Sequence, residues 1–599
     1  MTDGEFIGER TCDVLILGAG MAGGMLARHL RLQQPDLKIV VIERKAGFDY
    51  WVGESTVEVF TDYAERVLGL GPYLMTHQIL KHGLRFFFDS PGADLRMCEL
   101  SETGRARYPG VIPSYQLDRS TFDRDLCEIN RASGVEVLMG VRLSAEEEEP
   151  RSQPITIDPA GGHVVRTTAG TFRCRWLVDA AGRGSPLARM FHLVEKDPRH
   201  PVGSYWGRFQ HCRNMDQLGT DEWRARVDFT QRWLSTNHFM YKGYWIWHIP
   251  VKHDIISLGV SFNREMLPLT LRSGEELLTW LRGHKWGAEI LGPETKVLDF
   301  MQFKECARGA TKHFSEDRWY LTGMSGCVVD ALFSQTGVFN SYSNRLINEL
   351  IKTDRSGDRA RLRRQLTHFN VFMRMKYEAL VAALKYHRLG SYDAFIGWRT
   401  ARQHVYYNTD IPIGHTDLRD LIEAADAHGD ACGCTFERAL ADWQKKSIGA
   451  ALDRVADEFI VFVERTGSYY ARNKDHFCEA TERFRLAGKV HQPRRDLAVE
   501  RAEDRVSFEA MFRHFVGRML EIEGKRFNEE AFARVFEPDW ELGQTLSDVM
   551  IVMRDASSLA EADGGAPRGV RWLPKGPVDE ITLRDHGWYC RLTRPADAE

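Results

Sequence analysis

Apolar runs separated by glycine turns dominate the start of the chain. Residues 12–17 form an apolar run of strand length, residues 24–32 have helical spacing, and residues 38–42 form a second apolar run that ends at Glu43 and Arg44. Continuous apolar runs that alternate with a helical segment are typical of buried parallel strands in an α/β sheet. The pattern therefore predicts a strand–helix–strand unit near the N-terminus.

A different pattern, strict alternation, marks residues 245–250. At the two-residue period of a strand, Trp245, Trp247 and Ile249 fall on one face, and a proline closes the run. A second strand-like run, residues 255–262, follows a short polar turn. Taken alone, this segment predicts an ordinary β-hairpin with one half-buried aromatic face.

From about residue 346 the apolar spacing is helical, most clearly in residues 368–385 and 436–465. The segment 483–509 is rich in charge and predicts a loop between helices. No catalytic motif accompanies these segments. Two interpretations of this C-terminal third stay open: a helical domain that packs over the mouth of a substrate site, or a docking surface for a carrier protein or a second subunit.

Composition narrows the class of protein. The 599 residues carry a formal charge of −4, which gives no reason to expect nucleic acid or an anionic membrane as a partner. The chain lacks the ~18 consecutive apolar residues of a membrane-spanning helix, and its first residues lack the pattern of a secretion signal. The 11 cysteines are scattered, with Cys432 and Cys434 the only close pair, so we expect a reduced, cytoplasmic protein without a metal site.

A glycine motif follows the first predicted strand. In Gly18-Ala-Gly20-Met-Ala-Gly23 the first glycine permits a tight turn, the second lets the backbone approach a pyrophosphate, and the third allows close packing of helix and strand. Free N–H groups at the start of the helix favour that pyrophosphate. Glu43, followed by Arg44, ends the second predicted strand, where a carboxylate can accept hydrogen bonds from a ribose. These residues predict a dinucleotide site.

Further strand ends return to this unit from distant parts of the sequence. One predicted strand ends at Asp179 and another at Gly323, and after Asp330 the chain enters a helix expected to begin near Val338. Such returns are typical of FAD monooxygenase-like proteins, as is Arg119 at the start of a helix. The chain has a single GxGxxG motif, so we expect FAD and no separate Rossmann site for a nicotinamide.

The predicted fold class is therefore α/β, with an α+β substrate sheet inserted in a Rossmann-type, FAD monooxygenase-like domain, and with an added, mainly α-helical C-terminal domain. The predicted parts are the FAD-binding core at residues 1–345, its substrate sheet at about 85–115 and 195–305, and the helical domain at 346–599.

Taken together, these motifs resemble those of the flavin-dependent halogenases, over roughly residues 10–350. Besides the glycine motif, the resemblance rests on Gly53-Glu54-Ser55-Thr56, Lys81, the Trp-x-Trp-x-Ile-Pro run, and Phe-Ser-Gln-Thr-Gly at 333–337. The same FAD fold without the tryptophan pair is shared by hydroxylases, epoxidases and reductases.

The resemblance implies FADH2- and O2-dependent halogenation. Reduced flavin, supplied by a separate NAD(P)H-dependent flavin reductase, would give a C4a-hydroperoxide that oxidises chloride or bromide to hypohalous acid. Lys81 would hold this oxidant by a hydrogen bond or carry it as a haloamine, and the sequence does not separate these two options. Trp245 and Trp247 would form a wall that keeps the organic substrate away from the flavin.

The resemblance also assigns residues to the cofactor and the halide. Those at the cofactor would be Gly53, Glu54, Ser55, Thr56, Arg119, Asp179, Gly323 and Asp330. Thr336 and Gly337 are the candidate halide residues, because N–H groups at a turn that leads into a helix make a small anion site. The alternative is that Thr336 only caps the helix.

The chain departs from the family near these residues. Met324 stands where many members have an Asp that contacts the flavin ribityl chain, and Ala331 stands where a proline is common. The tryptophan halogenases have a glutamate where this chain has Phe333 or Ser334. We therefore expect a phenolic or pyrrolic substrate, free or tethered to a carrier protein, and not free tryptophan.

Two other functions stay open. The chain could be an FAD-dependent monooxygenase or reductase that keeps the fold and lacks halide chemistry. The departures from the family at residues 324 and 333–337 are compatible with this alternative. It could also be a flavin-binding accessory protein without turnover, although Lys81 and the tryptophan pair argue against that. The sequence leaves the oligomeric state undecided, with a homodimer as one option.

Overall fold

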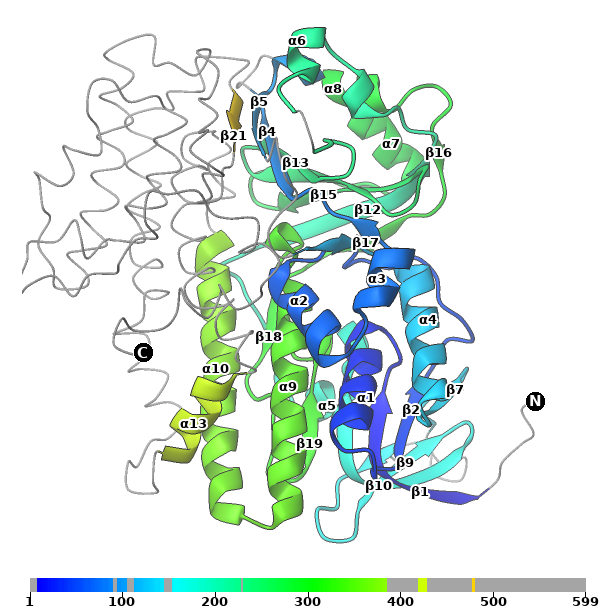
Figure 1. Cartoon of the computed structure of the whole chain (residues 1–599), viewed down its shortest axis with the longest axis vertical. Coiled ribbons are helices and arrows are strands. Elements are labelled where there is room, and N and C mark those ends of the chain that lie inside the picture. Colours follow the sequence, from blue (N-terminus) through cyan, green and yellow to red (C-terminus); the bar gives the residue numbers. More distant parts are fainter. Residues whose placement is uncertain are drawn as a thin grey trace, which may run out of the picture.

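Two sheets organise the chain, and Figure 1 shows them one above the other along the long axis of the molecule. The computed structural model describes residues 8–89, 94–104, 113–144, 153–227, 230–384, 418–427 and 477–479. Within these ranges the predicted fold class, a second sheet inserted in a Rossmann-type α/β domain, is confirmed. The predicted segments 436–465 and 483–509, and the pair Cys432 and Cys434, lie outside the described residues.

The seven-stranded sheet contains the predicted strand–helix–strand unit. Strands β7, β2, β1 and β10 run parallel, and β10 also pairs with parallel β19 and with antiparallel β9, which β8 extends. The bounds are β1 (Glu9–Leu17), β2 (Ile39–Glu43), β7 (Glu136–Met139), β8 (Ile155–Thr156), β9 (His163–Thr167), β10 (Gly170–Asp179) and β19 (Trp319–Leu321). The apolar runs predicted as buried parallel strands are the central strands here.

Three helices pack side by side on this sheet. Helix α1 (Met21–Gln33) contacts both α4 (Arg119–Ala132) and α9 (Gln335–Ser356) (Figure 1). A Cβ on Gly24 would lie 2.8 Å from the Leu126 side chain, so this glycine allows α1 and α4 to approach closely. Asp118 caps α4 by accepting the Ser120 N–H.

Most strands of the nine-stranded sheet fall in the ranges predicted for the substrate sheet, about 85–115 and 195–305. Its order is β16-β12-β15-β14-β13-β4-β5-β21, with β17 beside β12. The bounds are β4 (Leu84–Phe88), β5 (Ser101–Gly104), β12 (Val202–Gln210), β13 (Thr236–Tyr241), β14 (Tyr244–Pro250), β15 (Ile255–Asn263), β16 (Lys296–Val297), β17 (Met301–Phe303) and β21 (Phe477–Glu479). Helices α7 (Gly274–Arg282) and α8 (Lys285–Ile290) pack on one face of it, where the Trp286 ring stacks on Phe239 at 3.4 Å between centroids.

The remaining elements complete the described chain. They are α2 (Glu58–Asp62), a π-helical turn (Tyr63–Val67), α3 (Gly71–His77), β3 (Ile79–Leu80), 3-10 turns (Met97–Glu99, Gly182–Gly184, Met215–Gln217, Gly323–Ser325 and Leu332–Ser334), β6 (Tyr115–Gln116), α5 (Pro186–Met190), β11 (Val194–Lys196), α6 (Asp221–Arg224), β18 (Arg308–Ala310), β20 (Cys327–Val328), α10 (Arg359–Leu384) and α13 (Arg419–Ala427).

The predicted hairpin is formed by β14 and β15, and alternate side chains of β14 point to opposite faces of the sheet, as expected. Trp245, Trp247 and Ile249 join the core shared with the Rossmann-type sheet, whereas Ile246 joins the core beneath α7 and α8. The expectation of a half-buried strand was wrong, because β14 is buried on both faces from its second residue onward. Helices cover the second face, and the sequence of the strand alone does not contain that information.

Helix α9 begins at Gln335, three residues earlier than expected, and runs without a break through the predicted domain boundary at residue 345. Thr336 and Gly337 favour helix poorly, which is why a later start was predicted. Packing overrides that propensity: a Cβ on Gly337 would lie 3.0 Å from the Phe60 ring, so the glycine lets the first turn of α9 press against α2.

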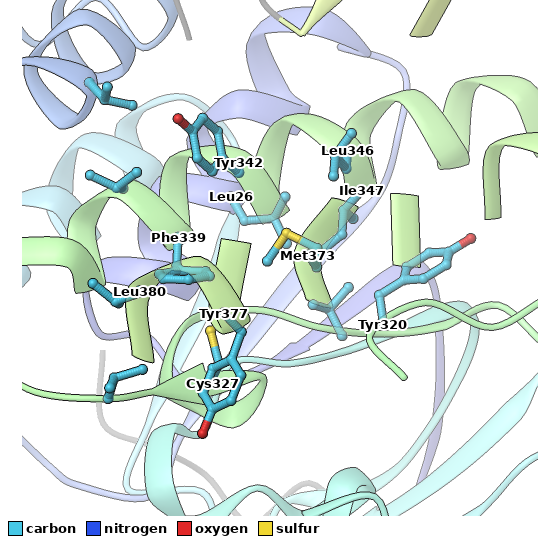
Figure 2. Packing of buried hydrophobic residues seen from close by; sticks show 14 of the residues in the cluster. Leu26, Tyr320, Cys327, Phe339, Tyr342, Leu346, Ile347, Met373, Tyr377 and Leu380 are labelled. Carbon is cyan, nitrogen blue, oxygen red and sulfur yellow. The ribbon is translucent and has the colours of Figure 1, made fainter. Parts of the chain in front are cut away.

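The first part of the predicted helical domain packs on this core. Helix α10 confirms the helix expected at residues 368–385 and lies along α9, with α13 against α10. Figure 2 shows this packing from Phe339, Tyr342, Leu346 and Ile347 of α9, Met373, Tyr377 and Leu380 of α10, and Leu26 of α1. The strand β21, which pairs with β5, was not predicted, and the division at residue 345 stays a prediction.

No helix in the described ranges is long and apolar enough to cross a membrane. The same ranges contain no cluster of three or more His, Cys, Asp or Glu side chains suited to a metal ion.

Gly259 on β15 provides a test of the packing within the second sheet, where it lies between Trp206 of β12 and Trp247 of β14. A Cβ there would lie 2.3 Å from Trp247 and 2.4 Å from Trp206, so Gly259→Ala should lower the free energy of unfolding by about 1–3 kcal/mol. Chemical unfolding measures it. Gly47→Ala is the control, because a Cβ on Gly47 would have no neighbour within 4 Å. Equal midpoints for the two variants would contradict the close packing.

Candidate functional site

A cavity of about 700 Å³ is lined by residues of both sheets. On one side lie the carboxyl ends of β1, β2 and β10, the edge at which open α/β sheets bind ligands. On the other side lie Trp206, Trp245 and Trp247 from the second sheet. Most of the predicted site residues meet in this cavity, although they come from positions as far apart as Gly18 and Gly337.

The glycine motif forms one end of the cavity. Gly18 has φ +107°, and a Cβ on it would lie 2.6 Å from the Ala180 carbonyl oxygen, so both conformation and space require glycine. Gly20 is the N-cap residue of α1, and neither a capping side chain nor an acidic residue occupies its first turn. Gly23 packs the helix on the strand, since a Cβ on it would lie 2.0 Å from the Gly18 oxygen. The N–H groups of this turn are therefore available to an anion.

Glu43 lies beside this turn and lines the cavity, as does the exposed Arg44. The Glu43 carboxylate accepts the Ala19 N–H at 3.0 Å on one oxygen and the Lys45 N–H at 3.1 Å on the other. Each carboxylate oxygen has two lone pairs, so one on each oxygen stays available for a ribose hydroxyl.

Arg119 connects the cavity to the loop of residues 53–56. Its guanidinium donates to Asp123 at 3.0 and 2.7 Å and to the Val52 carbonyl at 2.8 Å. Burial raises the pKa of Asp123, and the neighbouring Arg119 opposes that shift. Gly53 has φ +98°, and a Cβ on it would lie 3.0 Å from Arg119, so the loop can lie this close only with glycine there.

Glu54 and Thr56 fix the same loop from behind. Glu54 is 2% exposed, and burial raises its pKa against the opposing charge of Arg208, whose Nε lies 3.5 Å away. The Thr56 hydroxyl donates to the Tyr115 carbonyl at 2.7 Å and accepts the Tyr115 N–H at 2.8 Å. These contacts tie the loop to β6.

Asp330 lines the cavity together with Gly323, as predicted, whereas Asp179 does not. The Asp330 carboxylate contacts His200 Nε2 at 3.0 Å and accepts the Ser261 hydroxyl at 3.1 Å. Asp179 is fully buried, and burial raises its pKa. Its oxygens accept three donors from neighbouring loops, namely Ala181 N–H at 3.0 Å, Leu187 N–H at 2.9 Å and the Ser325 hydroxyl at 2.8 Å. The structure therefore gives Asp179 the task of holding the cavity wall.

Lys81 lies just outside the cavity, behind the loop that lines it. The side chain is 1% exposed, and its Nζ donates to the Ser55 hydroxyl at 2.9 Å and to the Thr56 carbonyl at 2.7 Å. The Ser55 hydroxyl also accepts the Ser334 hydroxyl at 2.9 Å. Ser55, Thr56 and Ser334 line the cavity, so the amine is one side chain away from it.

Ser334 belongs to a strained turn at the start of α9. Phe333 and Ser334 have φ of 64° and 56°, the left-handed region that non-glycine residues rarely adopt. The N-cap residue of α9 is Ser334, and no side chain caps the helix. Thr336 is already inside the first turn, so it is not the N-cap that one sequence interpretation allowed. Thr336 and Gly337 both line the cavity.

Trp245 and Trp247 lie in an aromatic row that crosses the site. Their ring centroids are 5.5 Å apart, and the Trp247 Nε1 donates to the Ser257 hydroxyl at 3.2 Å. Consecutive rings continue the row on both sides, in the order Phe333, Phe86, His238, Trp245, Trp247, Trp206 and Phe303. The row thus connects the strained turn before α9 to the opposite end of the cavity.

Sequence reasoning missed two residues that line this cavity, Trp206 and Asn340. Trp206 Nε1 and Asn340 Oδ1 are buried and have no hydrogen-bond partner within the described part of the chain. Asn340 Oδ1 lies 3.3 Å from where a Cβ on Gly323 would be, close to the position at which Met324 replaces the expected Asp. Asn340 follows Gly337 by three residues, so helical spacing could have placed both on one face of α9.

Comparisons with known proteins agree with this geometry. Residues 13–90 match the model of the tryptophan halogenase family. The chain is 28% identical over 366 residues to flavin-dependent halogenase chlA of Dictyostelium discoideum, covering 57% of this chain and 60% of that protein. It is 25% identical over 337 residues to a 1H-pyrrole-2-carbonyl peptidyl-carrier-protein chlorinase of Pseudomonas fluorescens, covering 54% of this chain and 71% of that one.

A solved structure shares the fold. The crystal structure of halogenase PltM matches with a TM-score of 0.59 and 16% identity, covering 76% of this chain and 92% of PltM. PltM in complex with phloroglucinol and FAD matches with the same TM-score of 0.59. The two sheets and the cavity between them have the FAD monooxygenase-like fold. The predicted resemblance to the flavin-dependent halogenases is confirmed.

Replacing Asp179 tests its structural role. Asp179→Asn puts an amide donor where three donors now converge, so we expect the free energy of unfolding to fall by about 1–3 kcal/mol. Thermal and chemical unfolding measure it. Asp221→Asn is the control, because the Asp221 side chain is 98% exposed. Unchanged stability of Asp179→Asn would show that these hydrogen bonds do not hold the wall.

Proposed function

We propose that the chain catalyses FADH2- and O2-dependent halogenation of an electron-rich aromatic compound, with chloride or bromide as the halide and Lys81 as the residue that directs the oxidant. The observation that carries this proposal is the buried amine of Lys81, hydrogen-bonded to two residues that line the cavity and, through Ser55, connected to the start of α9.

The residues present fit FAD. The uncapped first turn of α1 suits the pyrophosphate, and the two remaining lone pairs of Glu43 suit a ribose. Asn340 Oδ1 and Trp206 Nε1 are buried polar atoms that a ligand with both donors and acceptors would satisfy. When bound, reduced FAD would supply the O2-derived oxidant that converts the halide into hypohalous acid. A separate NAD(P)H-dependent flavin reductase would provide it in reduced form.

The start of α9 is the proposed halide site. Thr336 and Gly337 lie in the first turn, where backbone N–H groups have no intrahelical acceptor, and the helix dipole favours an anion. The turn before it is held in a strained conformation by Phe333, whose ring packs 6.3 Å from that of Phe86, and by Ser334, whose hydroxyl bonds Ser55. A halide there would lie at the cavity wall, beside the turn that Ser334 connects through Ser55 to the lysine.

Trp245 and Trp247 are proposed as the wall between the cofactor and the organic substrate. Both rings are at most 2% exposed and packed between the two sheets, so they cannot turn aside without opening the core. Such a wall would prevent direct oxygen transfer to the substrate. The amine of Lys81 would then polarise hypohalous acid by a hydrogen bond or form a haloamine.

A phenolic or pyrrolic substrate is proposed for two reasons. Phe333 and Ser334 stand where tryptophan halogenases have a glutamate, and the Phe333 ring is buried in the core rather than presented to a substrate. Among similar proteins, one acts on a pyrrole tethered to a carrier protein and another has been crystallised with phloroglucinol, a phenol. A carrier-tethered substrate, a homodimer and a cytoplasmic location are parts of the same proposal.

The tests of this function use Lys81. Lys81→Met should reduce halogenated product at least about 100-fold, because it removes the donor that directs the oxidant. The assay combines the protein, FAD, a flavin reductase, NADH, O2 and chloride or bromide with a panel of phenols, pyrroles and indoles. Halogen isotope patterns in the mass spectrum identify the product. Lys352→Met, which alters a side chain that is 66% exposed, is the control.

Two results would contradict the proposal. Products that gain oxygen instead of halogen, unaffected by Lys81→Met, would support the alternative of an FAD-dependent monooxygenase. Flavin binding without any product would support a flavin-binding accessory protein without turnover.

A further inference from the structure

The hydroxyl of Ser55 joins four segments that are distant in sequence. It contacts Lys81 Nζ at 2.9 Å, Ser334 Oγ at 2.9 Å and Thr236 Oγ1 at 2.8 Å. The Thr236 hydroxyl in turn contacts Gln116 Oε1 at 3.0 Å. The loop of residues 53–56, the lysine, the second sheet and the start of α9 therefore meet at one oxygen atom.

The hydrogen atoms of this group can be assigned from chemistry alone. A lysine amine in contact with a hydroxyl oxygen acts as donor, so Ser55 accepts from Lys81. Thr236 donates its hydrogen to Gln116, so it must accept from Ser55. Ser55 then has no hydrogen left for Ser334, which must donate to it. A hydroxyl has one donor and two acceptor positions, and Ser55 uses all three.

Full use of the hydroxyl has a geometric consequence. The amine cannot move relative to the start of α9 without breaking one of two hydrogen bonds in series, each 2.9 Å long. The second bond of Lys81, to the Thr56 carbonyl, comes from the residue next to Ser55, so both acceptors belong to one short loop. That loop is itself fixed by Arg119 and by the paired bonds of Thr56 and Tyr115.

The hydroxyls of Ser55, Thr236 and Ser334 lie between the cavity and Lys81. Ser55, Thr236 and Ser334 line the cavity, whereas Lys81 does not. Any oxidant that leaves the start of α9 for the amine passes this cluster of hydroxyls. The three hydroxyls form a polar path between the cavity and the amine.

We propose that Ser55 is a positioning residue that holds the Lys81 amine at a fixed place relative to the first turn of α9, so that oxidant formed at the halide site is captured by the amine instead of escaping. The inference rests on the proposed function and adds a residue to it. Ser55 does not oxidise the halide; it determines how much of the oxidant reaches the substrate.

The test compares Ser55→Ala with Ser55→Thr, which keeps a hydroxyl. Each reaction is run with flavin reductase, NADH, FAD, O2 and bromide, and two quantities are measured: halogenated phenol, and free hypohalous acid trapped by an added β-diketone. We expect Ser55→Ala to form the same total amount of oxidant as the wild type, within about twofold. The fraction of that oxidant recovered as halogenated phenol should fall about 10- to 100-fold, because displacing a reacting group lowers the rate of its reaction by about that factor. Ser55→Thr should restore most of that share.

The control is Ser133→Ala. Ser133 lies at the end of α4, outside the residues that line the cavity, and its hydroxyl donates to the Asn130 carbonyl at 2.8 Å. It should behave as the wild type. An equal halogenated share for Ser55→Ala and wild type would overturn the proposal. So would a parallel loss of total oxidant and product, which would place Ser55 at the cofactor or halide instead.

A second measurement needs neither flavin nor turnover. Reductive methylation with formaldehyde, read by peptide mass spectrometry, reports how freely each lysine reacts. Loss of one of its hydrogen bonds should raise the methylation rate of Lys81 several-fold in Ser55→Ala, with Lys352 as internal reference, and Ser55→Thr should reverse it. An unchanged methylation rate of Lys81 would contradict the proposal that Ser55 holds the amine. If the wild type makes no hypohalous acid, the proposed function fails while this measurement still decides whether Ser55 holds the amine.

Discussion

The two sheets of this protein bury their side chains in one shared apolar core, and the site is the space that this core leaves open. Val14 and Ile16 of the Rossmann-type sheet belong to the same buried cluster as Trp245 and Trp247 of the second sheet. On the face of the second sheet that this core covers, a single methyl group on Gly259 would collide with Trp206 and Trp247 on the neighbouring strands. Close packing of this kind fixes side-chain positions, so the cavity walls are set by the same contacts that hold the sheets together.

Buried polar groups hold the loops at the cavity wall in one position. Glu54, Asp179 and Asp330 all lie in or behind the cavity wall, and each contacts at least one side chain from a distant segment. Burial raises the pKa of Glu54 and Asp179, and the groups around them oppose that shift. Removing one partner leaves a buried group unsatisfied, at a cost of about 1–3 kcal/mol. Loops that carry such groups are therefore held in one position.

Much of the fold and most of the site could be predicted from the sequence, because both depend on local patterns. Apolar runs located β1 and β2, the alternation of Trp245 and Trp247 located β14, and helical spacing located α10. The glycine motif, the loop of residues 53–56 and Lys81 were chosen from motifs, and the structure gathers them around or next to one cavity. Those local patterns do not show which segments lie opposite one another in the fold. The short strand β21, the early start of α9 and the role of Asp179 in the wall all depend on such partners.

The sequence by itself determined the class of fold, the nucleotide-binding turn and the residue types available for chemistry, since periodicity and glycine conformation act over a few neighbouring residues. Only the tertiary structure decided that Lys81 lies just outside the cavity and reaches it through Ser55, that Trp206 extends the aromatic row, and that Asn340 lies beside Gly323. These outcomes follow from contacts between residues on different elements, such as Lys81 and Ser55, which are 26 positions apart in the sequence. No local pattern encodes them, because each exists only when the two sheets have closed on their common core.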